Sequence, residues 1–137
     1  MLVVFDPNIF VSALITPKGR ARQVVQTGID GQFEYAICPT LLDELERVSH
    51  RPKIATLLPG ETAARFIVDV RGGARLEADP DVRRVSRDPA DDYLVALAVS
   101  INADHLVTGD KDLLELAHPP VRITTLREFT DLLEPPS

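Results

Sequence analysis

The sequence has few features that would place the protein in a membrane or in an oxidising compartment. Cys38 is the only cysteine among 137 residues, so no internal disulfide can form. No apolar run approaches the ~20 residues that a membrane-spanning helix requires. The segment Met1–Asp6 has no basic leader, and its apolar run is too short for a signal peptide. We therefore expect a soluble protein that stays in the cytoplasm.

Positive charge is also scarce. There are 15 Lys and Arg residues against 21 Asp and Glu, and the formal net charge is −6. A broad surface that holds nucleic acid needs the opposite sign, because the phosphate backbone is negative. The composition thus argues against a module that only binds DNA or RNA. Any chemistry on nucleic acid would need a metal ion and a local basic patch. Lys18, Arg20 and Arg22 form one such patch, although a solvated helix face explains them equally well.

Length and composition predict one domain. A chain of 137 residues is of single-domain size and can bury a sizeable core. Hydrophobic residues make up 45% and charged residues 26%, which is ordinary for a globular protein. The sequence has no internal repeat, low-complexity segment or linker. We expect residues 1–137 to form a single domain, with 134–137 as a tail.

Short apolar segments alternate with helical patterns along the chain. The expected strands are Leu2–Phe5, Phe33–Cys38, Ala74–Glu77, His105–Thr108 and Val121–Thr124. The expected helices are Asn8–Ile15, Arg20–Gln26, Thr40–Val48, Glu61–Val70, Asp88–Ile101, Asp110–Leu116 and a last one from Thr125. Strands that alternate with helices pair in parallel. The fold prediction is an α/β protein, a three-layer α/β/α sandwich around a central, mainly parallel sheet of about four to five strands.

Three of these helices begin at capping signals. Asp88 is expected to cap the buried helix, with Pro89 at its first position. Thr125 and Glu128 have the spacing of a capping box. Thr40 is expected to cap the helix that follows the second strand.

Acidic residues follow several of the predicted strands or begin the helices after them. They are Asp6 after the first strand, Glu44 early in a helix, Asp91 and Asp92 in the first turn of the buried helix, and Asp110 after a later strand. Ligands of open parallel sheets bind beyond the carboxyl ends of the strands. We therefore expect these carboxylates to meet at one edge of the sheet.

Carboxylates gathered in this way repel one another and raise one another's pKa. A hard divalent cation removes this repulsion, and ligands that are all oxygen select Mg²⁺ or Mn²⁺ over Zn²⁺. Such a metal polarises a phosphoryl oxygen and generates hydroxide from bound water. Helix N-termini at the same edge add positive dipole ends, which suit phosphate. The pattern therefore indicates a metal site that acts on a phosphate ester.

Four segments of the sequence, in order, resemble the PIN-domain family and, within it, the bacterial toxin (VapC-like) branch. They are Val3–Ser12 (VVFDPNIFVS), Leu41–Glu44 (LLDE), Arg87–Ala98 (RDPADDYLVALA) and Leu106–Leu114 (LVTGDKDLL). Each segment alone is a weak signal. Together, in order and with fitting spacing, they are specific and span almost the whole chain.

The resemblance implies an endoribonuclease that uses Mg²⁺ or Mn²⁺, often the toxin of a toxin–antitoxin pair and often a homodimer. Its expected partners are an RNA substrate and a small antitoxin protein. The family's acidic positions fall on Asp6, Glu44, Asp92 and Asp110, which are the catalytic candidates. Asp6, Asp92 and Asp110 would bind one or two metal ions, while Glu44 would bind a second ion or orient the attacking water.

Five further residues are supporting candidates, and one position departs from the family. The supporting candidates are Asn8, Ser12, Asp91, Thr108 and Asp112. The family usually has Thr or Ser between its first Asp and the following Asn, where this chain has Pro7. Proline removes an N–H and a hydroxyl from that loop.

The acids also have structural explanations, except that Asp92, one residue further into its helix than Asp91, is harder to explain in this way and is preferred as a ligand. Asp6 suits a turn after a strand, and Asp110 suits a helix N-cap. Glu44 fits a solvated helix residue. Asp91 and Asp112 are expected in the first turn of a helix, where a negative charge interacts favourably with the helix dipole.

Two other functions remain open at this point. A phosphoacceptor or phosphatase-like α/β domain also gathers acids at strand ends, but it needs a lysine after a later strand. Lys111 is instead adjacent to an acid. A non-catalytic PIN-like binding module, inactivated by Pro7 or another change, is the second alternative, and the presence of all four acids argues against it.

Overall fold

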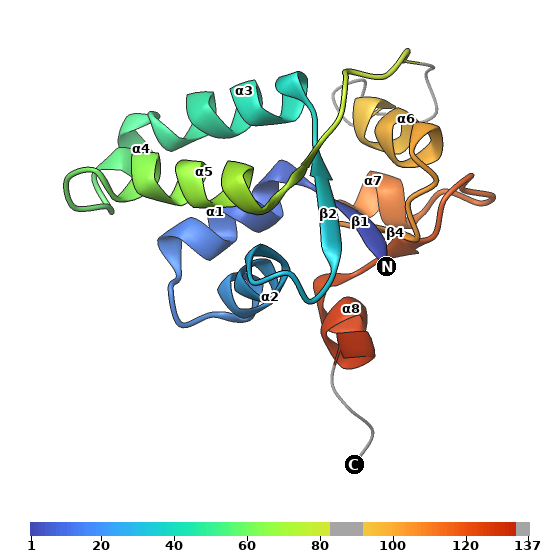
Figure 1. The fold of residues 1–137 in the computed structure, drawn as a ribbon, viewed down its shortest axis with the longest axis horizontal. Coiled ribbons are helices and arrows are strands. Elements are labelled where there is room, and N and C mark those ends of the chain that lie inside the picture. The colour runs from blue at the N-terminus through green and yellow to red at the C-terminus, as the bar shows by residue number, and fades with distance from the viewer. Residues whose placement is uncertain (83–91, 134–137) are drawn as a thin grey trace.

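The computed structural model describes residues 1–82 and 92–133, and it shows a five-stranded sheet with helices on both faces (Figure 1). The strands are β1 (Leu2–Phe5), β2 (Glu34–Ile37), β3 (Arg75–Leu76), β4 (His105–Val107) and β5 (Ile123–Thr124). Their order in space is β3-β2-β1-β4-β5, and each neighbouring pair is parallel. The predicted α/β sandwich is confirmed.

Helices form the two outer layers. They are α1 (Pro7–Ile15), α2 (Arg20–Ile29), α3 (Pro39–Ser49), α4 (Pro52–Ala55), α5 (Thr62–Gly73), α6 (Asp92–Ser100), α7 (Lys111–Leu114) and α8 (Leu126–Leu133). Figure 1 shows α1, α2, α3 and α5 on one side of the sheet, with α6 and α7 on the other. No helix within residues 1–82 and 92–133 combines the length and the apolar character that crossing a membrane would require.

The central strand β1 is apolar throughout because both faces of the sheet are covered there. Val3, Val4 and Phe5 are fully buried, as expected for the middle of a parallel sheet. The Phe5 ring makes edge-on contacts with Phe10 at 5.5 Å and with Phe129 at 6.0 Å between ring centroids. Such edge-on packing suits the quadrupoles of aromatic rings. β1 thus anchors the core and sets the position of the residue that follows it.

One helix start differs from the prediction. Thr40 does not cap α3, which begins one residue earlier at Pro39 and has Cys38 as its N-cap without a side-chain hydrogen bond. The Thr40 N–H instead donates to Asp79 Oδ1 over 2.8 Å. A side chain that lies after β3 therefore takes the place of the local cap.

The other capping box is confirmed. Thr125 Oγ1 accepts from the Glu128 N–H over 3.1 Å, and the Thr125 N–H donates to Glu128 Oε1 over 3.2 Å. The predictions for Asp88, Pro89 and Asp91 and for the tail 134–137 lie outside the described residues. The short helix α4 was not predicted.

Candidate functional site: an acidic group at the carboxyl edge of the sheet

Asp6 is the first residue after β1, and its side chain is almost completely buried, with 4% exposed. It caps α1, because its Oδ1 accepts from the Asn8 N–H over 2.9 Å. Its own N–H donates to the Val107 carbonyl over 2.9 Å, which ties it to the end of β4. Pro7 occupies the first position of α1, where a missing N–H leaves no helical hydrogen bond unmade. The Asp-Pro-Asn sequence therefore builds a well-satisfied strand-to-helix turn.

Thr108 joins the turn after β1 to the turn after β4. Its fully buried hydroxyl donates to Asp6 Oδ2 over 2.7 Å. The hydroxyl oxygen of Thr108 also accepts from the Asp110 N–H over 3.0 Å. Asp110 in turn caps α7, since its Oδ1 accepts from the Asp112 N–H over 2.7 Å. Asp6 and Asp110 are thus both helix caps and members of one polar network, so the structural and functional explanations do not exclude each other.

Glu44 lies on α3, and its side chain extends toward Asp6. Its side chain is half-buried, and its Oε2 accepts from the Tyr93 hydroxyl over 2.5 Å. Tyr93 follows Asp92 at the start of α6, a helix that packs against both β1 and β4. Asp92 is buried, with 2% exposed. The beginning of α6 therefore lies near Glu44 and near Asp6, whose charge acts on the Tyr93 hydroxyl.

The Asp6 carboxyl group interacts electrostatically with two other acids, Asp110 and Glu44. Burial is the main cause that raises the pKa of Asp6 above its usual 3.8, and the carboxylates of Asp110 and Glu44 raise this pKa further. The hydrogen bonds from the Asn8 N–H and Thr108 act in the opposite direction and lower it. Burial also raises the pKa of Tyr93, and the hydrogen bond to Glu44 adds to the shift, so the hydroxyl keeps its proton at neutral pH.

The structure thus brings together Asp6, Glu44 and Asp110, which we call the acidic group. Thr108 forms hydrogen bonds with two of these residues, Asp6 and Asp110. Asn8 is exposed and contributes its backbone N–H. Asp112 is half-buried and likewise donates its N–H to the group.

Ser12 does not join the acidic group through any hydrogen bond that the described residues show. It is exposed within α1, and its carbonyl accepts from the Thr16 N–H at the end of that helix.

The carboxylate oxygens of the acidic group are suitable ligands for a hard cation, but they do not converge on one point. Within residues 1–82 and 92–133, no three His, Cys, Asp or Glu side chains are arranged to hold a metal ion. A carboxylate offers about four lone-pair sites, so the two hydrogen bonds to Asp6 leave it able to accept more. Oxygen ligands of this kind match Mg²⁺ or Mn²⁺.

The basic residues near α2 do not form one free patch. The Arg22 guanidinium lies 4.9 Å from the centroid of the Phe66 ring, and Arg22 is partly buried there. This contact helps to pack α2 against α5, since a guanidinium over an aromatic face is attracted to it. Lys18 and Arg20 remain exposed.

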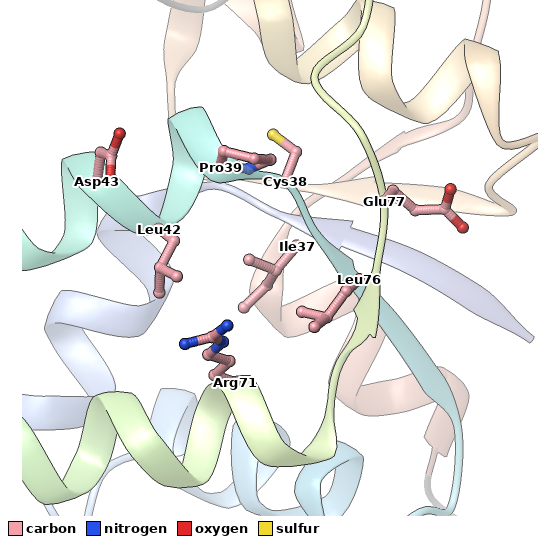
Figure 2. Close-up of a pocket in the computed structure, with 8 residues that line it drawn as sticks. All are labelled: Ile37, Cys38, Pro39, Leu42, Asp43, Arg71, Leu76 and Glu77. Carbon is pink, nitrogen blue, oxygen red and sulfur yellow. The ribbon is translucent and has the colours of Figure 1, made fainter.

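A cavity of about 260 Å³ lies between α3, α5 and β3, and it is distinct from the acidic group (Figure 2). It is lined by Ile37, Cys38, Pro39, Leu42, Asp43, Arg71, Leu76 and Glu77. Figure 2 shows the carboxylates of Asp43 and Glu77 pointing away from Arg71. None of the four acids predicted to be catalytic contributes to this lining.

Tyr93 contacts the acidic group through its hydroxyl, and no pattern in the sequence assigned it a role. A hydroxyl in the first turn of an otherwise apolar helix, directly after a candidate acid, is the signal that would have pointed to it. The partner of that hydroxyl lies 49 positions away on α3, which local sequence does not reveal.

Known proteins from several organisms are similar to this chain in sequence or in fold. The uncharacterized protein MJ1680 of Methanocaldococcus jannaschii is 29% identical over 115 residues, which are 83% of this chain and 74% of that protein. A chain of VapBC2 from Rickettsia felis, solved bound to a DNA fragment from its promoter, superposes with a TM-score of 0.58 and 17% identity, over 91% of this chain and 98% of its own. The PIN domain of human SMG5 superposes with a TM-score of 0.51 and 17% identity, over 98% and 100% of the two chains.

At 17% identity, the two solved structures show a shared fold and nothing more. The sequence profile of the PIN domain is more informative, because it matches residues 2–112. That range contains all four acids predicted to be catalytic and most of the sheet. This match favours the PIN interpretation over the phosphoacceptor alternative. The chain belongs to the PIN domain family, whose members are generally nucleases.

Proposed function

We propose that this protein is an endoribonuclease that hydrolyses RNA phosphodiester bonds and uses Mg²⁺ or Mn²⁺. The observation that carries the proposal is the buried carboxylate of Asp6, whose pKa is raised by burial and by two further carboxylates, Asp110 and Glu44. Such an arrangement opposes ionisation of Asp6 until a cation is bound. Perturbed acids gathered at the ligand-binding edge of a parallel sheet are typical of an active site.

Each acid has a separate role in this proposal. Asp6, Asp92 and Asp110 would hold the metal, directly or through water. A bound metal would supply Lewis acidity and would activate water at neutral pH. Glu44 would orient the attacking water or hold a second ion. Thr108 and the Asn8 N–H keep the Asp6 carboxylate in a single orientation, because each occupies one of its oxygens.

Pro7 is compatible with this activity. The non-catalytic alternative relied on the loss of an N–H and a hydroxyl at that position. In the structure, Pro7 stands at the first position of α1, and Asp6 receives its two hydrogen bonds from Asn8 and Thr108 instead. This arrangement supports an intact acidic loop.

The biological part of the proposal is that the protein acts in the cytoplasm as the toxin of a toxin–antitoxin pair. The four sequence segments that resemble the bacterial toxin branch of the family support this role, and the fold, which is that of a chain of VapBC2 from Rickettsia felis, is compatible with it. The proposed partners are a small antitoxin protein and a second copy of this chain. Growth arrest on induced expression, relieved by Asp6→Asn, is the expected result in cells.

The direct test is incubation of the purified protein with a panel of structured and single-stranded RNAs in Mn²⁺, Mg²⁺ or EDTA. A double variant, Asp6→Asn with Asp110→Asn, removes two of the acids. The matched control is Asp30→Asn with Asp131→Asn, which makes the same two changes at exposed positions on other elements. We expect metal-dependent cleavage by the wild type and by the control, and none by the first variant.

Two results would contradict the proposal in different ways. Cleavage that persists in EDTA, or in the folded Asp6 and Asp110 double variant, would show that these acids are only helix caps. A folded wild type that neither cuts any RNA of the panel nor binds Mn²⁺ would instead favour the non-catalytic PIN-like module.

A further inference from the structure

Tyr93 is buried beside the acidic group, with 8% of its surface exposed, and its ring belongs to the hydrophobic core. The ring packs against apolar side chains, while its hydroxyl donates to Glu44 Oε2 over 2.5 Å. A hydrogen bond of this length to a carboxylate is among the stronger ones in proteins. The proposed roles of the acids leave this contact unexplained.

We propose that Tyr93 is a positioning residue that holds the Glu44 carboxylate in a fixed orientation toward Asp6 for RNA cleavage, an inference that rests on the proposed function. Glu44 interacts electrostatically with Asp6, so its carboxylate already lies near the centre of the acidic group. Tyr93 determines which oxygen of Glu44 is engaged by the protein and which one is presented to the site.

The physical reason lies in the different stiffness of the two side chains. Glu44 is only half-buried, and a glutamate loses considerable rotamer freedom when it is held in one place. The Tyr93 ring, in contrast, is packed in the core, so its hydroxyl is a fixed donor. A catalytic group that is misplaced by about 1 Å can lose about 100-fold in rate, so a fixed donor matters to Glu44.

The contact also links two layers of the fold. Glu44 is on α3 and Tyr93 is on α6, and Figure 1 shows these helices on opposite sides of the sheet. The hydrogen bond therefore spans the carboxyl edge from one layer to the other. It connects Glu44 on α3 to the residue next to Asp92 on α6.

The chain offers a matched control for this role. Tyr35 is fully buried, and its hydroxyl donates to the Val70 carbonyl over 2.5 Å. It is thus a second buried tyrosine hydroxyl with a short hydrogen bond, but its acceptor is a backbone carbonyl of α5. Loss of either hydroxyl should lower stability, and only loss of the Tyr93 hydroxyl should change catalysis.

The kinetic test compares Tyr93→Phe, Tyr35→Phe, Glu44→Gln and the double variant at positions 44 and 93, with Mn²⁺ and an RNA that the wild type cleaves. We expect Tyr93→Phe to lower kcat about 10-fold with the KM for RNA unchanged, and Tyr35→Phe to stay within about twofold of the wild type. The double variant should be no slower than Glu44→Gln alone, because Tyr93 acts through Glu44.

A second readout does not depend on activity. The chain has two tyrosines, so protein labelled with ¹³C at the ζ carbon of tyrosine gives two NMR signals. Glu44→Ala should shift the Tyr93 signal, identified by its loss in Tyr93→Phe, and leave the Tyr35 signal in place. An unmoved Tyr93 signal would overturn the proposal, because the hydrogen bond would then be absent.

The outcomes separate this inference from the proposed function. A folded Tyr93→Phe variant that cleaves RNA as fast as the wild type would overturn the positioning role alone, and so would effects of the two substitutions that simply add. A wild type that cleaves no RNA with either metal would overturn the proposed function and, with it, a role for Tyr93 in cleavage.

Discussion

The hydroxyl of Thr108 donates to Asp6 Oδ2 over 2.7 Å, although the two residues are 102 positions apart in the chain. The same hydroxyl oxygen accepts from the Asp110 N–H over 3.0 Å. One buried threonine therefore holds together the two turns that carry Asp6 and Asp110. This side chain acts together with the hydrogen bond from the Asp6 N–H to the Val107 carbonyl, which also ties Asp6 to the end of β4.

Replacing Thr108 by valine should weaken both the fold and the proposed activity. Thr108→Val keeps the shape but removes a buried hydrogen bond from Asp6 and a partly buried one from the Asp110 N–H. We expect the free energy of unfolding to fall by about 1–3 kcal/mol in urea denaturation. RNA cleavage should fall at least about 10-fold, because Asp6 loses its fixed orientation.

Thr124→Val is the control for this substitution. Thr124 is also buried, and its hydroxyl bonds to His105 Nδ1 over 2.7 Å and not to a carboxylate. The Thr124→Val variant should lose about as much free energy of unfolding as Thr108→Val and should retain the wild-type cleavage rate per folded molecule. Equal cleavage rates for the Thr108 and Thr124 variants would contradict the proposed role of Thr108.

The raised pKa of Asp6 predicts a pH-dependent gain in stability for Asp6→Asn. In the unfolded chain, this carboxyl releases its proton near its usual pKa of 3.8, whereas in the folded protein, burial keeps the proton bound to higher pH. Folding is therefore penalised progressively as pH rises from about 4 to the folded pKa, and the full penalty remains above it. Without metal, Asp6→Asn should melt higher than the wild type at pH 7, and this gain should shrink toward pH 4.

Thermal melts in EDTA between pH 4 and 7 measure this difference, with the exposed Asp131→Asn as control. Added Mn²⁺ should raise the Tm of the wild type more than that of Asp6→Asn, because bound ligand stabilises the state that holds it. A gain that is the same at every pH would show that ionisation of Asp6 does not oppose folding.

His105 should make the fold sensitive to mild acid. Burial is the main cause that lowers the pKa of His105 below its usual 6.5, Arg122 lowers it further, and Asp104 opposes the shift. As pH falls through about 6.5, the unfolded chain takes up a proton first, so the stability contributed by neutral His105 is lost between that pH and the lower pKa of the folded state. The urea midpoint of the wild type should therefore drop between pH 7 and pH 5 relative to that of His105→Gln, in which the opposing contribution of Asp6 is the same.

His105→Gln should show a smaller drop over the same interval, since it lacks the titrating ring. His118→Gln changes an exposed histidine and should behave like the wild type. Parallel decreases in all three proteins would mean that other groups cause the acid sensitivity.

Phe129 should be among the most costly residues to truncate. It is fully buried on α8, and its ring lies 5.2 Å from that of Phe33 and 6.0 Å from that of Phe5. Phe129→Ala should lower the free energy of unfolding by about 3–5 kcal/mol, through lost burial and the cavity left behind. Leu132→Ala on the same helix, where 54% of the side chain is exposed, should change it by less than about 0.5 kcal/mol. Similar losses at both positions would argue against α8 packing on β1.

Features that depend on residues close together in the chain could be predicted from the sequence. The Asp6-Pro7 pair was expected to form a turn, and Thr125 and Glu128 were expected to form a capping box; both are present. In these cases, the interacting groups are within three residues of one another, so the spacing of residue types is sufficient evidence.

Features that depend on distant residues were missed or misjudged. The prediction that Thr40 caps α3 was wrong, because Asp79 supplies the acceptor from 39 positions away. α2 extends past the predicted end at Gln26 to Ile29, and Gly28 inside it allows the rings of Phe33 and Tyr35 to approach so closely that a Cβ would lie 2.9 Å from either. No local pattern reports such a contact.

The sequence by itself determined the alternation of strands and helices, and with it a parallel sheet whose carboxyl edge receives Asp6 and Asp110. Tertiary structure alone decided how completely Asp6 is buried, which hydroxyl holds it and which tyrosine engages Glu44. The reason is that periodicity records which face of an element is apolar. A hydrogen bond between residues 49 or 102 positions apart depends on how whole elements pack.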